Sequence, residues 1–140
     1  MESVFYYSKH KALWQYMAKK ETIMKIANTV KNKCYHDIKD AVDNVVGATK
    51  RKYINDTYNE EVICSCYACK ACEHKCYECP ILIGRCYEED SCFNNYIKAI
   101  AFYVVTGDNK YIEEAHEYAI IIAMAGLKGD ILIDYNLEVK

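Results

Sequence analysis

Residues 64–80 read CSCYACKACEHKCYECP, and this cysteine-dense stretch divides the chain into two flanks with helical patterns. The chain contains nine cysteines. An odd number excludes complete pairing in internal disulfides. The first residues do not have the basic-then-apolar pattern of a secretion signal. Metal binding therefore explains the cysteines better than a disulfide framework does.

Two Cys-x-x-Cys pairs in this stretch predict a zinc site with the ligands Cys66, Cys69, Cys76 and Cys79. Each pair directs two thiolates at one ion, and two pairs complete a tetrahedral Zn²⁺ shell. The register is ambiguous, because Cys69 and Cys72 form a third such pair. The alternative ligands, which also allow a second ion, are Cys64, Cys72, His74, Cys86 and Cys92. An iron–sulfur cluster is a less favoured occupant, and buried thiols without metal are a further alternative.

The predicted zinc site is structural and the protein is not expected to be an enzyme. A shell of four thiolates is closed and electron-rich, whereas catalytic zinc keeps an open position. The His-x-Glu and Pro-Cys-x-x-Cys signature of zinc deaminases is not matched, because Pro80 follows a Cys-x-x-Cys pair instead of preceding it. No Ser-His-Asp set, phosphate loop or paired-carboxylate motif is found in the sequence. Zinc would contribute folding energy to a region with few apolar residues.

Both flanks and the cysteine stretch resemble small uncharacterised phage and prophage proteins of Firmicutes. Residues 10–18, HKALWQYMA, are similar to the K-x-x-L-W-x-x-L-A opening of that family. Its Cys-x-x-Cys, spacer and Cys-x-x-Cys-Pro-Leu pattern matches Cys66, Cys69, Cys76, Cys79, Pro80 and Ile81, and its later cysteine resembles Cys86 or Cys92. Residues 119–127 are similar to its closing helix. Residues 21–60 and the tail do not match. The resemblance implies a phage-encoded zinc-binding protein and no particular reaction.

The apolar periodicity predicts four helices. The first runs from Ser8 to about Lys20 and includes Trp14 as a core anchor. The others are expected from Thr22 to Gly47, from Ser91 to Gly107 and from Asp108 to Gly126. The pair Asn55-Asp56 is read as a turn.

Alternating apolar residues predict a short strand at 62–66 and a second one at 131–139. The expected fold class is mainly α (α+β), with about four helices packed around a small cysteine-rich zinc knuckle and a short C-terminal β element. Residues 1–140 are expected to form a single domain. It consists of a helical part (1–50), a cysteine-rich metal-binding insert (60–92) and a second helical part with a C-terminal strand (91–140).

The composition of the chain limits the classes of partner that the protein is expected to bind. The 140 residues carry a net charge of −2, which excludes strong non-specific attraction of the whole surface to nucleic acid. No apolar run reaches the length of about 18 residues that a membrane span needs, so a cytoplasmic protein without membrane contact is expected. Acidic residues form two candidate partner surfaces, a loop with Glu88, Glu89 and Asp90 and a helix face with Glu113 and Glu117. The basic cluster Lys50, Arg51 and Lys52 is either a weak phosphate or nucleic-acid site or a solvated helix end.

These features predict a phage-encoded, non-enzymatic zinc-binding protein that inhibits a host defence component by steric protein–protein contact. The expected target is a host defence protein, and CRISPR effectors are among the candidates. Two alternatives remain open. One is an oligomeric sponge for a nucleotide immune signal, in which Lys50, Arg51 or Lys52 holds the phosphate. The other is a zinc-dependent nucleic-acid-binding protein.

Overall fold

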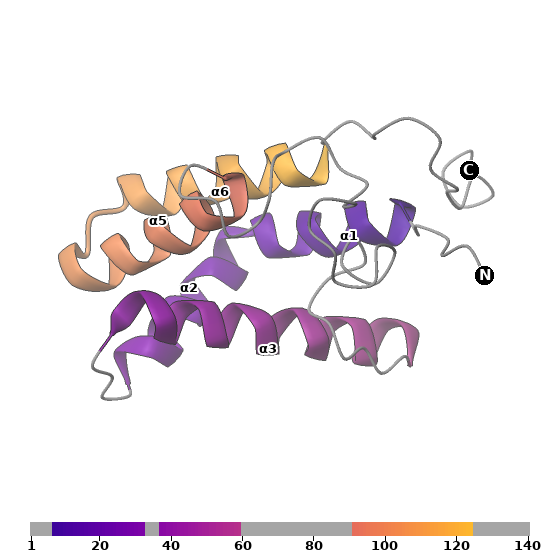
Figure 1. The fold of residues 1–140 in the computed structure, drawn as a ribbon, viewed down its shortest axis with the longest axis horizontal. Coiled ribbons are helices and arrows are strands. Elements are labelled where there is room, and N and C mark those ends of the chain that lie inside the picture. The colour runs from indigo at the N-terminus through magenta and orange to yellow at the C-terminus, as the bar shows by residue number, and fades with distance from the viewer. Residues whose placement is uncertain (1–6, 33–36, 60–90, 125–140) are drawn as a thin grey trace.

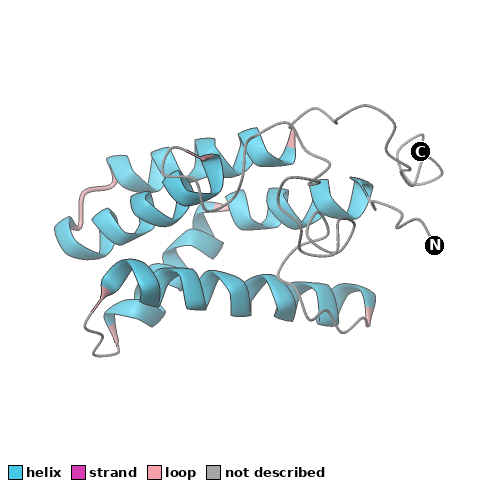
Figure 2. Ribbon diagram, in the orientation of Figure 1, coloured by secondary structure: helices cyan, strands magenta, loops and turns pink. Residues whose placement is uncertain are grey.

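The computed structural model describes residues 7–32, 37–59 and 91–124, and these form five helices (Figure 2). The helices are α1 (Tyr7–Ala18), α2 (Lys20–Lys31), α3 (Ile38–Tyr58), α5 (Cys92–Thr106) and α6 (Lys110–Ala123). The helices α5 and α6 form a hairpin that packs on α1, and α3 packs on α2 and α5 (Figure 1). The mainly helical class predicted from the sequence is confirmed.

Residues that favour helix ends set several of the boundaries. The side chain of Ser91 accepts a hydrogen bond from the backbone N–H of Asn94 at 3.1 Å, as expected for an N-cap of α5. Gly107 ends α5 with φ +71°, a conformation that glycine adopts without strain. Asp108 was expected to cap α6; its carboxylate accepts from the backbone N–H of Lys110 at 3.0 Å, and the N-cap position itself is Asn109.

The single helix predicted from Thr22 to Gly47 is wrong, because the chain forms two helices there. The helix α2 ends at Lys31, and Asp37 caps α3 by accepting from the N–H of Asp40 at 3.2 Å. Apolar residues keep their helical spacing across the break, so the periodicity alone did not reveal it. The expected break near Thr22 lies instead at Lys19, and Thr22 is a buried residue of α2.

Gly47 does not stop a helix, and Asn55-Asp56 is not a turn, because both lie inside α3. The guanidinium of Arg51, one turn further on, packs over Gly47. A Cβ atom at Gly47 would lie 3.2 Å from Nη1 of Arg51. Glycine therefore provides space for this side chain within a continuous helix, which ends at Asn59 in the left-handed conformation.

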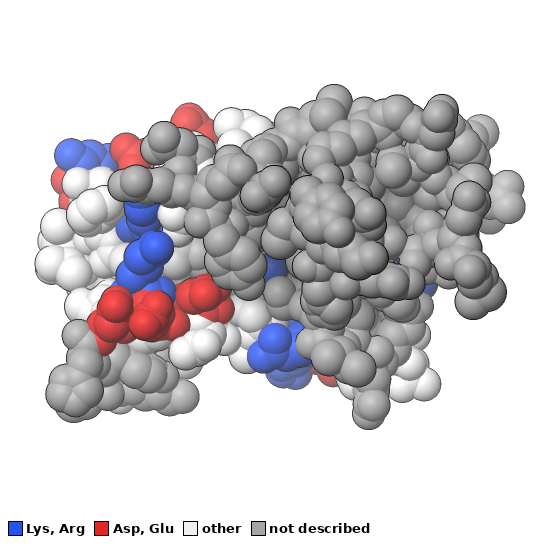
Figure 3. Space-filling model, viewed as in Figure 1, with Lys and Arg blue, Asp and Glu red and all other residues white. Residues whose placement is uncertain are grey.

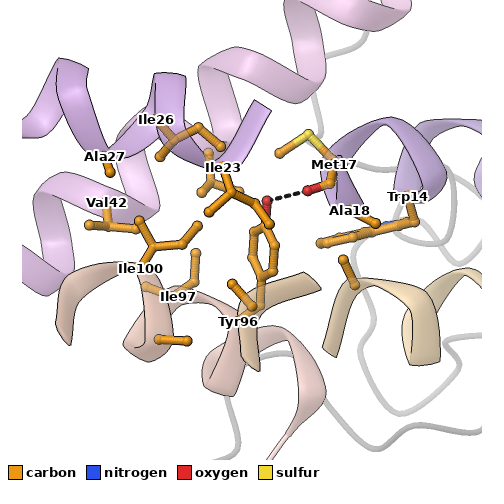
Figure 4. Packing of buried hydrophobic residues seen from close by; sticks show 14 of the residues in the cluster. Trp14, Met17, Ala18, Ile23, Ile26, Ala27, Val42, Tyr96, Ile97 and Ile100 are labelled. Atoms are coloured by element: carbon orange, nitrogen blue, oxygen red, sulfur yellow. Dashed lines mark hydrogen bonds between the residues drawn. The ribbon is translucent and has the colours of Figure 1, made fainter. Parts of the chain in front are cut away.

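One hydrophobic core joins all five helices, and Figure 4 shows its centre. Trp14 is 2% exposed and contacts the rings of Phe93 and Tyr96 edge-on, with ring centroids 6.0 and 5.5 Å apart. This confirms Trp14 as a core anchor. The inward positions expected for α6 are also confirmed, since its buried residues are Ile112, Ala115, Ala119, Ile122 and Ala123.

Polar side chains of α5 and α6 satisfy the carbonyl groups at the end of α1. The Tyr96 hydroxyl donates to the Met17 carbonyl at 2.8 Å, and Nδ1 of His116 lies 2.6 Å from the Ala18 carbonyl (Figure 4 shows the first). The last carbonyls of a helix have no partner within it. These bonds therefore fix where α1 ends against the α5–α6 hairpin.

The two predicted strands and the zinc knuckle lie outside the described residues, and the ranges 7–32, 37–59 and 91–124 contain no strand. Within the same ranges, no helix combines the length and the apolar composition that a membrane span requires.

Candidate functional site

The predicted zinc ligands Cys66, Cys69, Cys76 and Cys79 lie outside the described residues, as do Cys64, Cys72, His74 and Cys86. Among the described residues, no group of three or more His, Cys, Asp or Glu side chains is placed to hold a metal ion. The helices fix the two ends of this segment. It leaves α3 after Asn59 and enters α5 at Ser91. The alternative ligand Cys92 is the first residue of α5 and has a free, half-buried thiol, whose pKa is raised by desolvation.

The burial of Lys50 in α3 is unexpected for a lysine, because the residue is only 2% exposed. Its ammonium lies over two aromatic rings, 4.6 Å from the centroid of Phe93 and 5.1 Å from that of Trp14. Phe93 follows Ser91 by two residues, so this buried cation lies next to the point where the cysteine segment rejoins the helices. Such cation–π contacts contribute about 2 kcal/mol or more when the pair is desolvated.

The cation–π contacts do not compensate for burial of the charge. Among the described residues, no carboxylate forms an ion pair with Lys50. A buried ammonium carries a desolvation penalty of several kcal/mol, and buried charges are normally paired. The positive charge also acts on His10, whose pKa is lowered to about 4, mainly by burial and also by Lys50 and Lys11. This corner of the core therefore favours a negative charge nearby.

The three residues of the basic cluster have different surroundings. Lys50, Arg51 and Lys52 lie inside α3, so they do not form a solvated helix end. Lys50 points into the core, Arg51 packs over Gly47, and Lys52 is exposed and forms an ion pair with Asp56 at 2.7 Å. The three side chains therefore do not form one phosphate-binding surface. Lys52 alone of the three lines the cleft between α2 and α3 that is described below.

Of the predicted partner surfaces, Glu88, Glu89 and Asp90 lie outside the described residues, whereas Glu113 and Glu117 are both exposed on α6. Glu113 forms an ion pair with Lys20. Figure 3 shows acidic and basic side chains lying next to one another on the face in view. The ion pair reduces the negative charge that Glu113 presents to a partner and leaves Glu117 as the more available carboxylate.

Sequence reasoning missed three apolar residues that continue this surface. Ile120, Ile121 and Met124 are 38%, 48% and 62% exposed. A helix turns by about 100° per residue, so positions 113, 117, 120, 121 and 124 fall on one side of α6. We call Glu113, Glu117, Ile120, Ile121 and Met124 the α6 face. The expected inward set contained the signal, because Ala119, Ile122 and Ala123 leave Ile120 and Ile121 outside.

No family model matches the chain, and no curated protein or solved structure shows significant similarity to it. The resemblance to phage proteins therefore stays a prediction.

Proposed function

We propose that the protein is a phage-encoded, non-enzymatic zinc-binding protein that occupies and inhibits a host defence protein. The observation that carries the inhibitory function is the α6 face. It combines an acidic half with an apolar half on one rigid helix. Exposed apolar groups bordered by polar ones are typical of protein-binding surfaces.

The charge of the α6 face indicates the kind of partner. Glu117 has no ion pair among the described residues, and it lies one turn before Ile120 and Ile121. Carboxylates complement a basic surface, and electrostatic complementarity directs both encounter and register. The groove in which a CRISPR effector or another defence nuclease binds nucleic acid is basic. We propose that the α6 face binds at such a groove and blocks it sterically.

The zinc part of the proposal is supported by the cysteine spacing and by Lys50. A zinc ion with four thiolates has a net charge of −2, and a buried cation at the end of the cysteine segment stabilises such a charge. Cys66, Cys69, Cys76 and Cys79 remain the proposed ligands. Bound zinc would order the segment between α3 and α5, and the acidic residues Glu88, Glu89 and Asp90 would extend the partner surface.

A plasmid-interference assay tests the inhibitory function. Cells with an active CRISPR effector lose a targeted plasmid, and co-expression of the inhibitor retains it. The double variant Glu117→Lys/Ile121→Asp reverses one charge and places a charge in the apolar half of the α6 face. We expect wild type to retain the plasmid and to copurify with the effector, and the variant to lose both properties.

The control variant is Glu21→Lys, which makes the same charge change at an exposed position of α2. It should behave as wild type in plasmid retention and copurification. The double variant should unfold at the wild-type temperature, because its substituted side chains lie on the surface. Glu21→Lys should unfold at a slightly lower temperature, because it places a positive charge in the first turn of α2. A face variant that protects as well as wild type would exclude the α6 face. A wild-type chain that protects against none of a panel of host defence effectors would refute the inhibitory function.

A further inference from the structure

A cleft of about 570 Å³ lies between α2 and α3. Apart from Lys52, its lining residues belong neither to the basic cluster nor to the α6 face. Helix α2 contributes Lys25 and Thr29, which are one turn apart, and α3 contributes Thr49, Lys52 and Asp56 at helical spacing. The volume falls within the usual range for small-molecule sites, roughly 300–1,000 Å³. The cleft therefore has room for a small-molecule ligand with two or three rings and one charged group.

Aromatic side chains form one wall of this cleft. The rings of Tyr16 and Tyr53 stack with their centroids 4.5 Å apart and an interplanar angle of 23°. Tyr58 contacts Tyr53 edge-on at 6.3 Å, and the Lys19 ammonium lies 5.9 Å from the centroid of the Tyr16 ring. These contacts hold the rings in place before any ligand binds. A fixed aromatic wall favours an aromatic ligand, since little conformational entropy is lost on binding.

The threonine hydroxyls of the cleft are available as acceptors. Thr29 donates its proton to the Lys25 carbonyl at 2.8 Å, and Thr49 donates its proton to the Val45 carbonyl at 2.7 Å. Each hydroxyl oxygen then keeps lone pairs for a ligand donor. Because the hydroxyl protons are used within the helices, these threonines favour a ligand that offers hydroxyl or amino groups.

The charges of the cleft favour an anion. Its ionisable lysines and carboxylate are Lys25, Lys52 and Asp56, which sum to +1. Lys52 and Asp56 bind each other, whereas Lys25 has no ion pair among the described residues. An ammonium at the mouth of a cleft is a suitable partner for a phosphate group.

We propose that this cleft binds a nucleoside monophosphate or a nucleotide unit of that size. Lys25 holds the phosphate, and Lys52, which is paired with Asp56, is the second cation of the cleft. The ribose hydroxyls donate to Thr29 and Thr49. The base lies along the wall formed by Tyr16 and Tyr53. None of the residues that line this site belongs to the α6 face or to the predicted zinc ligands, so the test of this site is independent of the test of the proposed inhibition.

Calorimetric titration of the full chain tests the proposal, with AMP, GMP, CMP and UMP as probes and with inorganic phosphate and adenosine as partial ligands. We expect at least one monophosphate to bind, and phosphate and adenosine to bind at least tenfold more weakly. Lys25→Gln should weaken binding of the monophosphate at least tenfold and leave adenosine binding unchanged. Thr49→Val, which removes the hydroxyl and keeps the shape, should weaken both.

The matched control is Lys39→Gln, because Lys39 is exposed on α3 and does not line the cleft. It should bind the monophosphate as wild type does. Three results would overturn the proposal: no binding of any monophosphate, phosphate alone binding as tightly as the nucleotides, or equal affinities of Lys25→Gln and Lys39→Gln. Unfolding temperatures of all variants, measured without ligand, separate loss of binding from loss of fold.

Discussion

Replacing Lys50 by methionine should have opposite effects on the metal-free and the zinc-loaded protein. Methionine keeps a flexible apolar side chain between Trp14 and Phe93 and removes the charge. In the metal-free protein, the change removes a desolvation penalty of several kcal/mol and loses the two cation–π contacts, which share one buried ammonium and together contribute about 2 kcal/mol. The metal-free variant should therefore be more stable than wild type by about 1–2 kcal/mol.

In the zinc-loaded protein the sign reverses. Coulomb's law with an effective dielectric constant of about 20 gives about 4 kcal/mol for a unit charge and a charge of −2 that are about 8 Å apart, the separation that the proposed zinc site is assumed to have from Lys50. Loss of this attraction exceeds the gain from removing the buried charge, so the loaded variant should be less stable by about 2 kcal/mol. Even a third of the attraction, about 1.4 kcal/mol, weakens zinc binding tenfold.

The assay is thermal and urea unfolding, followed by circular dichroism with zinc and with chelator, together with zinc competition against a chromophoric chelator. Lys39→Met, an exposed substitution on the same helix, is the control and should change neither form. Equal shifts of the Lys50→Met variant in the two forms would refute the role of Lys50 as a counter-charge. Unchanged zinc affinity would refute it as well.

Three further predictions concern the helical core. Folding lowers the pKa of His10 from 6.5 to about 4, so the free energy of unfolding should fall by about 3 kcal/mol as the pH falls from 6.5 to 4. Urea unfolding measures this loss, which should be absent in His10→Gln. Tyr96→Phe leaves the Met17 carbonyl without its hydroxyl donor and should lower the free energy of unfolding by about 1–3 kcal/mol; an unchanged urea midpoint would show that the bond is not needed. Ser91→Ala removes the cap bond to Asn94 and should cost about 1 kcal/mol, whereas Ser91→Asp should restore most of it.

Local signals in the sequence were sufficient for the bounds of α5 but not for those of α6, whose N-cap is Asn109 instead of Asp108 and whose C-cap is Met124 instead of the expected Gly126. Ser91 and Gly107 mark the two ends of α5 as expected, because capping depends on residues within one turn of the helix end. The break before Asp37 was missed, since its capping carboxylate competes with an apolar period that continues without interruption. Gly47 was predicted to end a helix, but it lies inside α3 and provides space for the side chain of Arg51. A glycine pattern alone does not distinguish these two roles.

The candidate sites depended on contacts that are distant in sequence. Lys50 is one of three consecutive basic residues, and such clusters are normally solvated. Its burial follows from Trp14 and Phe93, which come from the two flanks of the chain. The cleft likewise requires α2 and α3 to be separate helices. A sequence prediction that joined residues 22–47 into one helix had no means of placing Lys25 opposite Lys52.

The proposed zinc site is tested by the metal content of the full chain, purified without chelator. Native mass spectrometry measures this content beside that of the Cys66→Ser/Cys76→Ser variant. We expect at least one zinc ion bound to wild type, and we expect the variant to lose that ion and to unfold at a lower temperature. Wild type that binds no zinc, or a variant with unchanged zinc content and unchanged unfolding temperature, would show that these cysteines do not form a zinc site.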